Sequence, residues 1–291
     1  MASLKDVRVK ISGVRKTKQI TRAMNMVASA KLRGAQSRME KIRAYAGRFH
    51  DMFRNLTARD TELTHALLTP HEEVKRVGII LATSDRGLCG GFNVNLIAEA
   101  LKLANAAKAE GKEAVFYCAG KKGRDAIRKS GFPIVRDLAG VMGNLSFAVA
   151  ERIGTEIIDG YLRHELDEVV FVYSKFQSLM RQTPAAQRIL PLRPDAADGE
   201  TAAGAPQHMV EPSGEALMDM LLPRIIKALI YRGLLDTSTS ENAARMTAMD
   251  NATRNCDDLI KSLTRLFNKT RQAVITNELI DIVGGVEALK G

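Results

Sequence analysis

Residues 245–274, RMTAMDNATRNCDDLIKSLTRLFNKTRQAV, carry the clearest indication of how this chain folds. Apolar or small side chains recur in it at alternating steps of three and four residues: Met246, Met249, Thr253, Cys256, Ile260, Leu263, Phe267, Thr270 and Val274. A mean spacing of 3.5 residues places these side chains along one seam of a helix that winds around a partner helix. The pattern therefore predicts a coiled coil near the C-terminus.

The opposite end of the chain supplies the partner. Its seam steps by three and four at Leu4, Val7, Ile11 and Val14, drifts through Ile20, Met24 and Val27, and resumes at Ala35, Met39, Ile42, Ala46, Phe49, Phe53 and Leu56. Residues 1–69 and 224–291 contain no proline, so both ends can form long helices. We expect these two helices to pair with each other.

The expected helices cover residues 3–57 and 213–283, which corresponds to lengths of roughly 80 Å and 105 Å. The longer helix should project beyond the shorter one. Pro223 should kink or break it near its start, and Gly284-Gly285 should end it.

The middle of the chain alternates between strand-like and helix-like segments. Strands are expected at 75–82, 114–118 and 168–173, with an edge strand at 189–192, and helices at 95–110, 121–130 and 147–164. Such alternation is typical of an α/β domain with a largely parallel sheet. Residues 193–208 are rich in Ala, Gly and Pro and should form a loop. The predicted fold is a long antiparallel coiled coil with an inserted, Rossmann-like α/β domain, divided into residues 1–60, 74–209 and 210–291.

Positive charge is concentrated at the N-terminus. Residues 1–48 carry a net charge of +11, whereas the whole chain carries +10. This segment should face an acidic protein, a nucleic acid or a membrane surface. No run of 18 apolar residues predicts a membrane span. The three cysteines and five histidines are scattered without metal-binding spacing, so neither a metal site nor a cofactor is expected.

A glycine-rich turn, SDRGLCGGF at 84–92, follows the first expected strand. Such turns can hold a phosphate at a helix N-terminus, but this one fits neither GxGxxG nor the P-loop pattern. Cys89 has no neighbouring His or acid that would make it a nucleophile, and Asp85 and Arg86 are the only titratable candidates for an enzyme site. A structural turn is the favoured interpretation.

Five segments resemble the gamma subunits of F-type rotary ATP synthases of the bacterial or mitochondrial type. They are ITRAMNMVASAKLR (20–33), SDRGLCGGFN (84–93), EPSGEALMDMLLPR (211–224), ENAARMTAMDNAT (241–253) and RQAVITNELIDIVGG (271–285). The resemblance implies a central-stalk rotor that transmits torque between the proton-driven c-ring and the catalytic alpha3beta3 head. It also implies contacts with alpha, beta, epsilon and the c-ring, no binding of nucleic acid, and a peripheral position at the cytoplasmic face of the bacterial plasma membrane.

The resemblance further implies that no residue of the chain is catalytic and that its functional residues make coupling contacts. These residues are Met24, Arg245, Gln272, Thr276 and Glu278. No two cysteines share a loop, so the dithiol regulation of chloroplast members is not expected. Two other classes stay open on residue patterns alone: a nucleotide-using α/β enzyme with helical arms, and a basic coiled-coil protein that binds nucleic acid.

Overall fold

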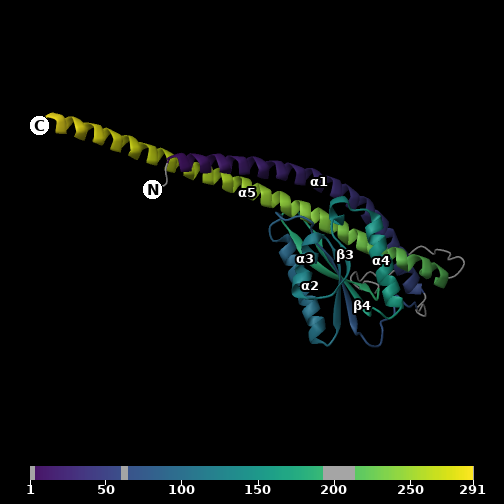
Figure 1. Cartoon of the computed structure of the whole chain (residues 1–291). Helices are drawn as coiled ribbons and strands as arrows, with labels where there is room; N and C mark the ends of the chain where they lie inside the picture. Colours follow the sequence, from purple (N-terminus) through teal and green to yellow (C-terminus); the bar gives the residue numbers. More distant parts are fainter. Residues whose placement is uncertain (1–3, 60–64, 193–213, 291) are drawn as a thin grey trace. The chain divides into compact units, whose positions relative to one another are not determined.

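The computed structural model describes residues 4–59, 65–192 and 214–290 (Figure 1). The chain divides into two compact units, Met1–Ala28 with Met246–Gly291 and Ser29–Arg245. Helices α1 (Leu4–Arg59) and α5 (Gly214–Lys290) each contribute to both units. The predicted fold class is confirmed, with two long terminal helices and an α/β sheet domain between them in the chain. The predicted loop at 193–208 lies outside the described residues.

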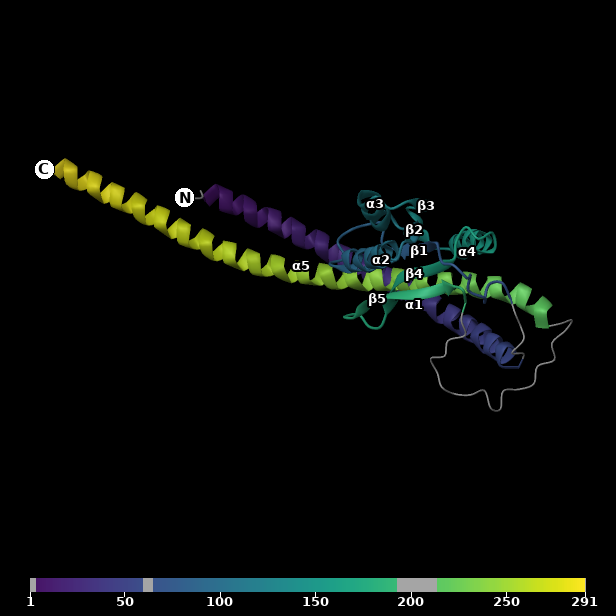
Figure 2. The same ribbon diagram turned by 90° about the horizontal axis from the view of Figure 1, so that it is seen from below.

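The first unit is an antiparallel pair of helices. Lys18 Nζ lies 2.5 Å from Asp257 Oδ1, the hydroxyls of Thr21 and Thr253 are 2.8 Å apart, and the Asn25 side chain donates to the Met246 carbonyl oxygen at 2.8 Å. As numbering rises along α1 it falls along α5, so the helices run in opposite directions. Figures 1 and 2 show α5 continuing past the start of α1.

The seam of α1 differs from the expected one. Ile20 and Val27 are 60% and 58% exposed, so the predicted drift of the seam through them is wrong. The three-four spacing instead continues from Val14 through Lys18, Thr21 and Asn25 to the buried Ala28. The polar seam positions are tolerated because each finds a hydrogen-bond partner on α5.

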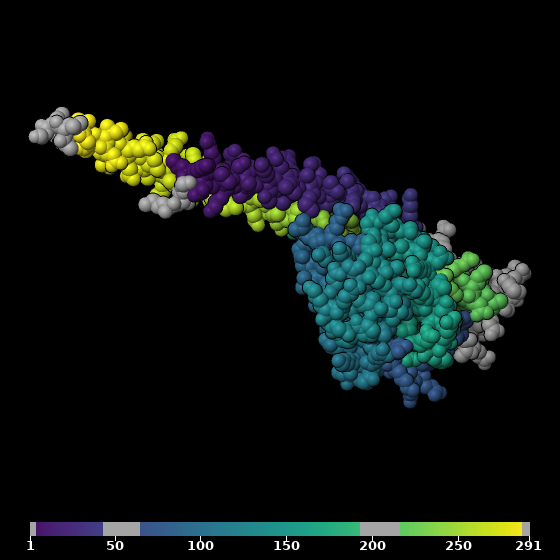
Figure 3. Space-filling view, viewed as in Figure 1, coloured from purple at the N-terminus to yellow at the C-terminus, as the bar shows by residue number. Residues whose placement is uncertain are grey.

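The seam of α5 ends at Thr270. Residues 271–286 are all exposed, and Val274 is 37% exposed, so the expectation that it packs against the N-terminal helix is wrong (Figure 3, yellow). The helix also runs through Gly284-Gly285 to Lys290, against the prediction that the glycines end it. Each glycine costs a helix only about 1 kcal/mol, and no proline follows them. Pro223 likewise lies inside the continuous helix.

The second unit contains a five-stranded sheet. Its strands are β1 (Arg76–Ala82), β2 (Glu113–Ala119), β3 (Ile134–Leu138), β4 (Glu168–Phe176) and β5 (Gln182–Leu190), in the order β3-β2-β1-β4-β5. The first four are mutually parallel and β5 is antiparallel to β4, so the expected largely parallel sheet is confirmed. Strand β3 was not expected because Arg136 and Asp137 interrupt its short apolar pattern.

Helices lie against both faces of this sheet (Figure 1), and each face is packed in an apolar core. On one face lie α2 (Phe92–Ala109) and α3 (Lys121–Ser130), with Leu96, Phe116 and Ile127 buried among them. On the other lies α4 (Phe147–Leu162), together with residues 218–235 of α5, around Ile153 and Phe171. A short 3-10 helix, Val141–Asn144, precedes α4. In the described part of the chain, no helix combines the length and apolar character needed to cross a membrane.

Candidate functional site

The predicted coupling residues do not gather into one cluster. Met24 is half-buried in the first unit, at the level where its neighbour Asn25 donates to Met246. Gln272, Thr276 and Glu278 lie on the exposed end of α5, and Gln272 is roughly 40 Å along the helix from Met246. These polar groups therefore do not crowd a buried seam, and Thr276 donates its hydroxyl to the Gln272 carbonyl of its own helix at 2.9 Å.

Arg245 belongs to the second unit and has partners within it. One of its terminal nitrogens lies 2.7 Å from Glu241 Oε1 and donates to the carbonyl oxygens of Arg86 and Gly87 at 3.3 Å each. The side chains of Arg245 and Glu241 are only 12% and 10% exposed. Burial raises the pKa of Glu241, and the adjacent guanidinium offsets only part of that rise. The guanidinium thus ties the glycine-rich turn to α5.

The glycine-rich turn has the geometry of a structural element. The Asp85 carboxylate accepts hydrogen bonds from three backbone N–H groups, those of Lys121 at 3.0 Å, Gly140 at 2.7 Å and Met142 at 3.1 Å. Leu88 and Gly90 adopt positive φ angles of 64° and 59°, which makes the turn tight. The only carboxylate of the turn is therefore engaged in holding three loops together.

Cys89 in this turn lacks the surroundings of a nucleophile. Its sulfur accepts a hydrogen bond from the Asn93 side chain at 3.2 Å and lies 3.9 Å from the Ser84 hydroxyl. Burial raises the pKa of the thiol, which disfavours the reactive thiolate. These contacts support the structural interpretation of the turn over an enzyme site.

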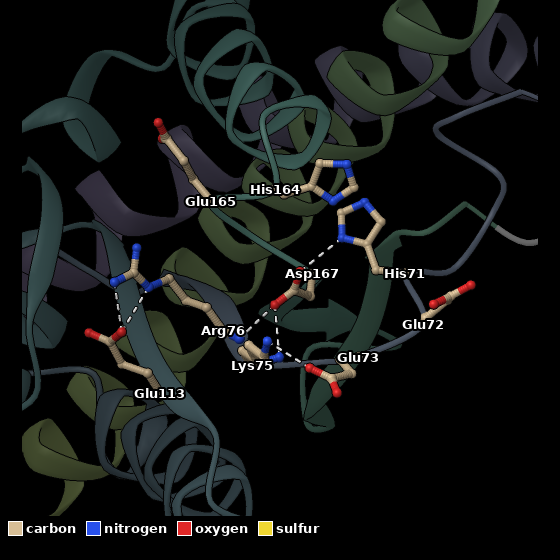
Figure 4. Close-up of a pocket in the computed structure, with 9 residues that line it drawn as sticks. All are labelled: His71, Glu72, Glu73, Lys75, Arg76, Glu113, His164, Glu165 and Asp167. Atoms are coloured by element: carbon tan, nitrogen blue, oxygen red, sulfur yellow. Dashed lines mark hydrogen bonds and ion pairs between the residues drawn. The ribbon is translucent and has the colours of Figure 1, made fainter.

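A cavity of about 560 Å³ opens where β1 and β4 begin (Figure 4). The residues that line it are His71, Glu72, Glu73, Lys75, Arg76, Glu113, His164, Glu165 and Asp167. The two carboxylate oxygens of Asp167 form hydrogen bonds with different partners. Oδ1 lies 2.8 Å from Nδ1 of His71, and Oδ2 accepts the backbone N–H groups of Lys75 and Arg76 at 2.8 Å each.

Aromatic rings stack beside this carboxylate. The His71 ring stacks on Tyr161 with centroids 4.3 Å apart, and the centroid of the His164 ring lies 4.2 Å from that of His71. Burial would raise the pKa of Asp167, but its hydrogen bonds from His71 and the two backbone N–H groups outweigh burial and lower it. The cavity thus holds a fixed carboxylate and two imidazoles.

No sequence pattern indicated this group of side chains. His71 and Asp167 are 96 residues apart, and the fold brings them together at the edge where two parallel strands start. Ligand atoms of His71, His164 and Asp167 all lie within 4.8 Å of one another. Only the parallel pairing of β1 with β4 creates this proximity.

Comparison with known proteins gives a match along the whole chain. The family model described as ATP synthase matches residues 3–289. The ATP synthase gamma chain of Nitratidesulfovibrio vulgaris (strain DSM 19637 / Miyazaki F) is 59% identical over 293 residues, and the match covers 100% of both chains. The gamma chains of Maridesulfovibrio salexigens and Lawsonia intracellularis are 56% and 53% identical, again over 100% of each chain.

Solved structures share the fold. The central stalk and c-ring structure of Tetrahymena thermophila mitochondrial ATP synthase contains a chain that is 25% identical, with a TM-score of 0.61, covering 80% of this chain and 99% of that one. A chain of the Euglena gracilis mitochondrial ATP synthase rotor is 21% identical, with a TM-score of 0.62, covering 94% and 98%. At that identity the second match supports the fold alone.

Proposed function

Because this chain belongs to the ATP synthase gamma chain family, we propose that it is the central-stalk rotor subunit of an F-type ATP synthase. It transmits torque between a proton-driven c-ring and an alpha3beta3 head that makes or hydrolyses ATP. The observation that carries this proposal is the 59% identity to a gamma chain over the full length of both chains. The coiled coil and the sheet domain agree with it, since a solved central stalk shares them.

The exposed end of α5 is evidence for a protein partner that surrounds it. Between residues 271 and 286 the exposed large apolar side chains are Val274, Ile275, Leu279, Ile280, Ile282, Val283 and Val286. A contiguous apolar surface of this kind is typical of a protein interface rather than of a freely solvated helix. We infer that the alpha and beta subunits enclose this end, and that Gln272, Thr276 and Glu278 contact them.

The positive charge of α1 is evidence for an acidic partner beside this helix. Residues 1–48 carry a net charge of +11, and such a helix repels itself unless negative charge lies near. An acidic segment of beta is the partner that we propose, with Met24 at the contact. Arg245 would engage loops of the alpha and beta ring, although its guanidinium is already bound to Glu241 and to two carbonyls of its own unit.

The chain itself contributes no catalytic group in this proposal. Asp85 is engaged by three backbone N–H groups, and Cys89 is buried. The chain would be peripheral to the membrane, attached to it through the complex, at the cytoplasmic face of a bacterial plasma membrane. The α/β domain, taken as residues 74–209 between coil segments 1–60 and 210–291, would lie toward epsilon and the c-ring.

The test is reconstitution of the full chain with alpha and beta subunits, and with the complete synthase in membrane vesicles. We expect no ATP hydrolysis by the chain alone and full activity in the complex. Met24→Lys should retain ATP hydrolysis while proton pumping falls, because a new cation at the contact shifts the relative energies of rotary states by about 1–3 kcal/mol.

Met26→Lys is the matched control. Met26 lies two residues after Met24 and is 61% exposed, and its replacement by Lys adds the same charge. It should pump protons like the wild type. If Met24→Lys also pumped normally, the proposed contact would be wrong. If the chain failed to assemble with alpha and beta at all, the rotor proposal itself would fail.

A further inference from the structure

We propose that His71 and His164, with Asp167 as the orienting carboxylate, bind a divalent transition metal ion such as Zn²⁺. The site lies in the cavity where β1 and β4 begin (Figure 4). It is separate from the coupling contacts proposed above and does not depend on them. One ring nitrogen of each histidine and one carboxylate oxygen of Asp167 already lie within 4.8 Å of one another.

The hydrogen bonds of Asp167 determine which nitrogen of His71 is available. An ionised carboxylate only accepts hydrogen bonds, so His71 Nδ1 donates to Oδ1 at 2.8 Å. In the neutral ring the other nitrogen, Nε2, then carries a lone pair. A carboxylate that orients a histidine in this way is the usual outer partner of a metal-ligating imidazole.

The ring of His71 is also held in place. It stacks on Tyr161, whose hydroxyl donates to the Thr69 carbonyl oxygen at 2.7 Å, and its side chain is only 13% exposed. Two of the three parts of the site, His71 and Asp167, are thus fixed before any ion arrives. Such preorganisation lowers the cost of binding.

The second imidazole is close and adjustable. Figure 4 shows a ring nitrogen of His164 on the side of His71 that faces away from Asp167. Two nitrogens bound to one tetrahedral zinc at 2.0–2.1 Å are about 3.4 Å apart. His164 is exposed, so rotation of its side chain can bring its nitrogen to that separation. Water would complete the coordination.

The charge around the cavity favours a cation. Five carboxylates line it, from Asp167 and from Glu72, Glu73, Glu113 and Glu165, against two basic side chains. Those two are paired, Lys75 with Glu73 at 2.6 Å and Arg76 with Glu113 at 2.7 Å. The remaining negative charge attracts a divalent ion, and imidazole ligands select zinc, copper, nickel or cobalt over magnesium or calcium.

A second His–Asp pair in the same unit supplies a matched control. His65 Nε2 lies 3.0 Å from Asp219 Oδ1, and its Nδ1 accepts the backbone N–H of Leu67. This pair belongs to no group of metal-ligating side chains within the described residues. Replacing His65 therefore removes a histidine from the same unit without touching the proposed site.

The experiment is calorimetric titration of Zn²⁺ into the full-length chain after treatment with a chelator. We expect one Zn²⁺ per chain in the wild type and in His65→Gln, and a loss of affinity of at least about tenfold in His164→Gln. Because His164 is exposed, that variant should keep its fold, which circular dichroism checks. Asp167→Asn should weaken binding by about 10–100-fold by releasing the orientation of His71.

Co²⁺ as a probe tests the ligand type. If Co²⁺ bound to the wild-type chain shows absorption bands typical of nitrogen and oxygen ligands, and these bands are lost in His164→Gln, the proposed site is supported. A thiolate charge-transfer band that vanishes in Cys256→Ser would overturn it, because the ion would then be held by a cysteine of the coil. Absence of binding to the wild type, or equal binding by His164→Gln, would also overturn it.

Discussion

The burial of helix α5 differs between the two units to which it contributes. In the second unit, residues 234–243 are buried without interruption, and residues 218–230 supply much of one sheet core. In the first unit, Met249 is the one buried large apolar residue of α5 among residues 246–286. The same helix is therefore enclosed by a core in one unit and supported by a single seam in the other.

The enclosed stretch tolerates polar residues because their hydrogen bonds are made locally. The Thr237 hydroxyl donates to the Gly233 carbonyl and accepts the backbone N–H of Ser174 in β4, and the Ser240 hydroxyl donates to the Ser174 carbonyl. Small hydroxylated residues let the helix approach the strand closely without leaving an unsatisfied group. The packing of α5 against β4 therefore depends on small side chains, whereas the seam of the first unit depends on side chains that recur every three or four residues.

The largest predicted contrast is between two phenylalanines. Phe171 is fully buried in the sheet core, so Phe171→Ala should reduce the free energy of unfolding of the second unit by about 3–5 kcal/mol. Phe267 is half-buried on the coil seam, so Phe267→Ala should cost the first unit only about 1–2 kcal/mol. Native-state hydrogen exchange measures both, because it reports each unit separately. Equal losses would show that the seam is packed as tightly as the core.

The next contrast uses one change with opposite signs. A Cβ added at Gly233 would lie 2.2 Å from Phe171 Cε1, so Gly233→Ala should destabilise the second unit by about 1–3 kcal/mol. Nothing lies within 4 Å of a Cβ added at Gly13, so Gly13→Ala should stabilise the first unit by about 0.5–1 kcal/mol. Urea denaturation followed by circular dichroism measures both shifts. A stabilising Gly233→Ala would contradict the close approach of α5 to β4.

The smallest contrast leaves stability unchanged and concerns thiol reactivity. Burial raises the pKa of Cys118 to about 12 and also raises that of Cys89, so the reactive thiolate is disfavoured at both residues. Cys256 is half-buried on the coil seam and should react first with a disulfide reagent. We expect one fast thiol per native chain and three after unfolding. Cys256→Ser should remove the fast phase, and its persistence in that variant would show that the sheet core opens readily.

Three polar seam positions of α1 could not be assigned from spacing alone. Ile20, Met24 and Val27 suggested a drifting seam because they are apolar, as seam residues usually are. The structure keeps strict spacing and accepts Lys18, Thr21 and Asn25 at seam positions. Their partners lie on α5, more than 200 residues away along the chain, so no local pattern could reveal them.

The two long helices, the alternation of strands and helices between them, and the family could all be predicted from the sequence. The helices and strands follow from repeating spacings of apolar residues, and the family follows from motifs that are contiguous in the chain. Helix α3 has the bounds that its sequence predicted, 121–130, because a short amphipathic pattern lies between two glycines.

Which polar groups meet depends on the folded arrangement of segments that are distant in the chain. It placed Arg245 against the carbonyls of Arg86 and Gly87, turned Asp85 into a bridge between loops, and joined His71, His164 and Asp167 at one edge of the sheet. Hydrogen bonds act over about 3 Å and depend on where distant segments come to lie. That placement follows from the parallel pairing of β1 with β4 and from the packing of α5, which no single stretch of the chain encodes.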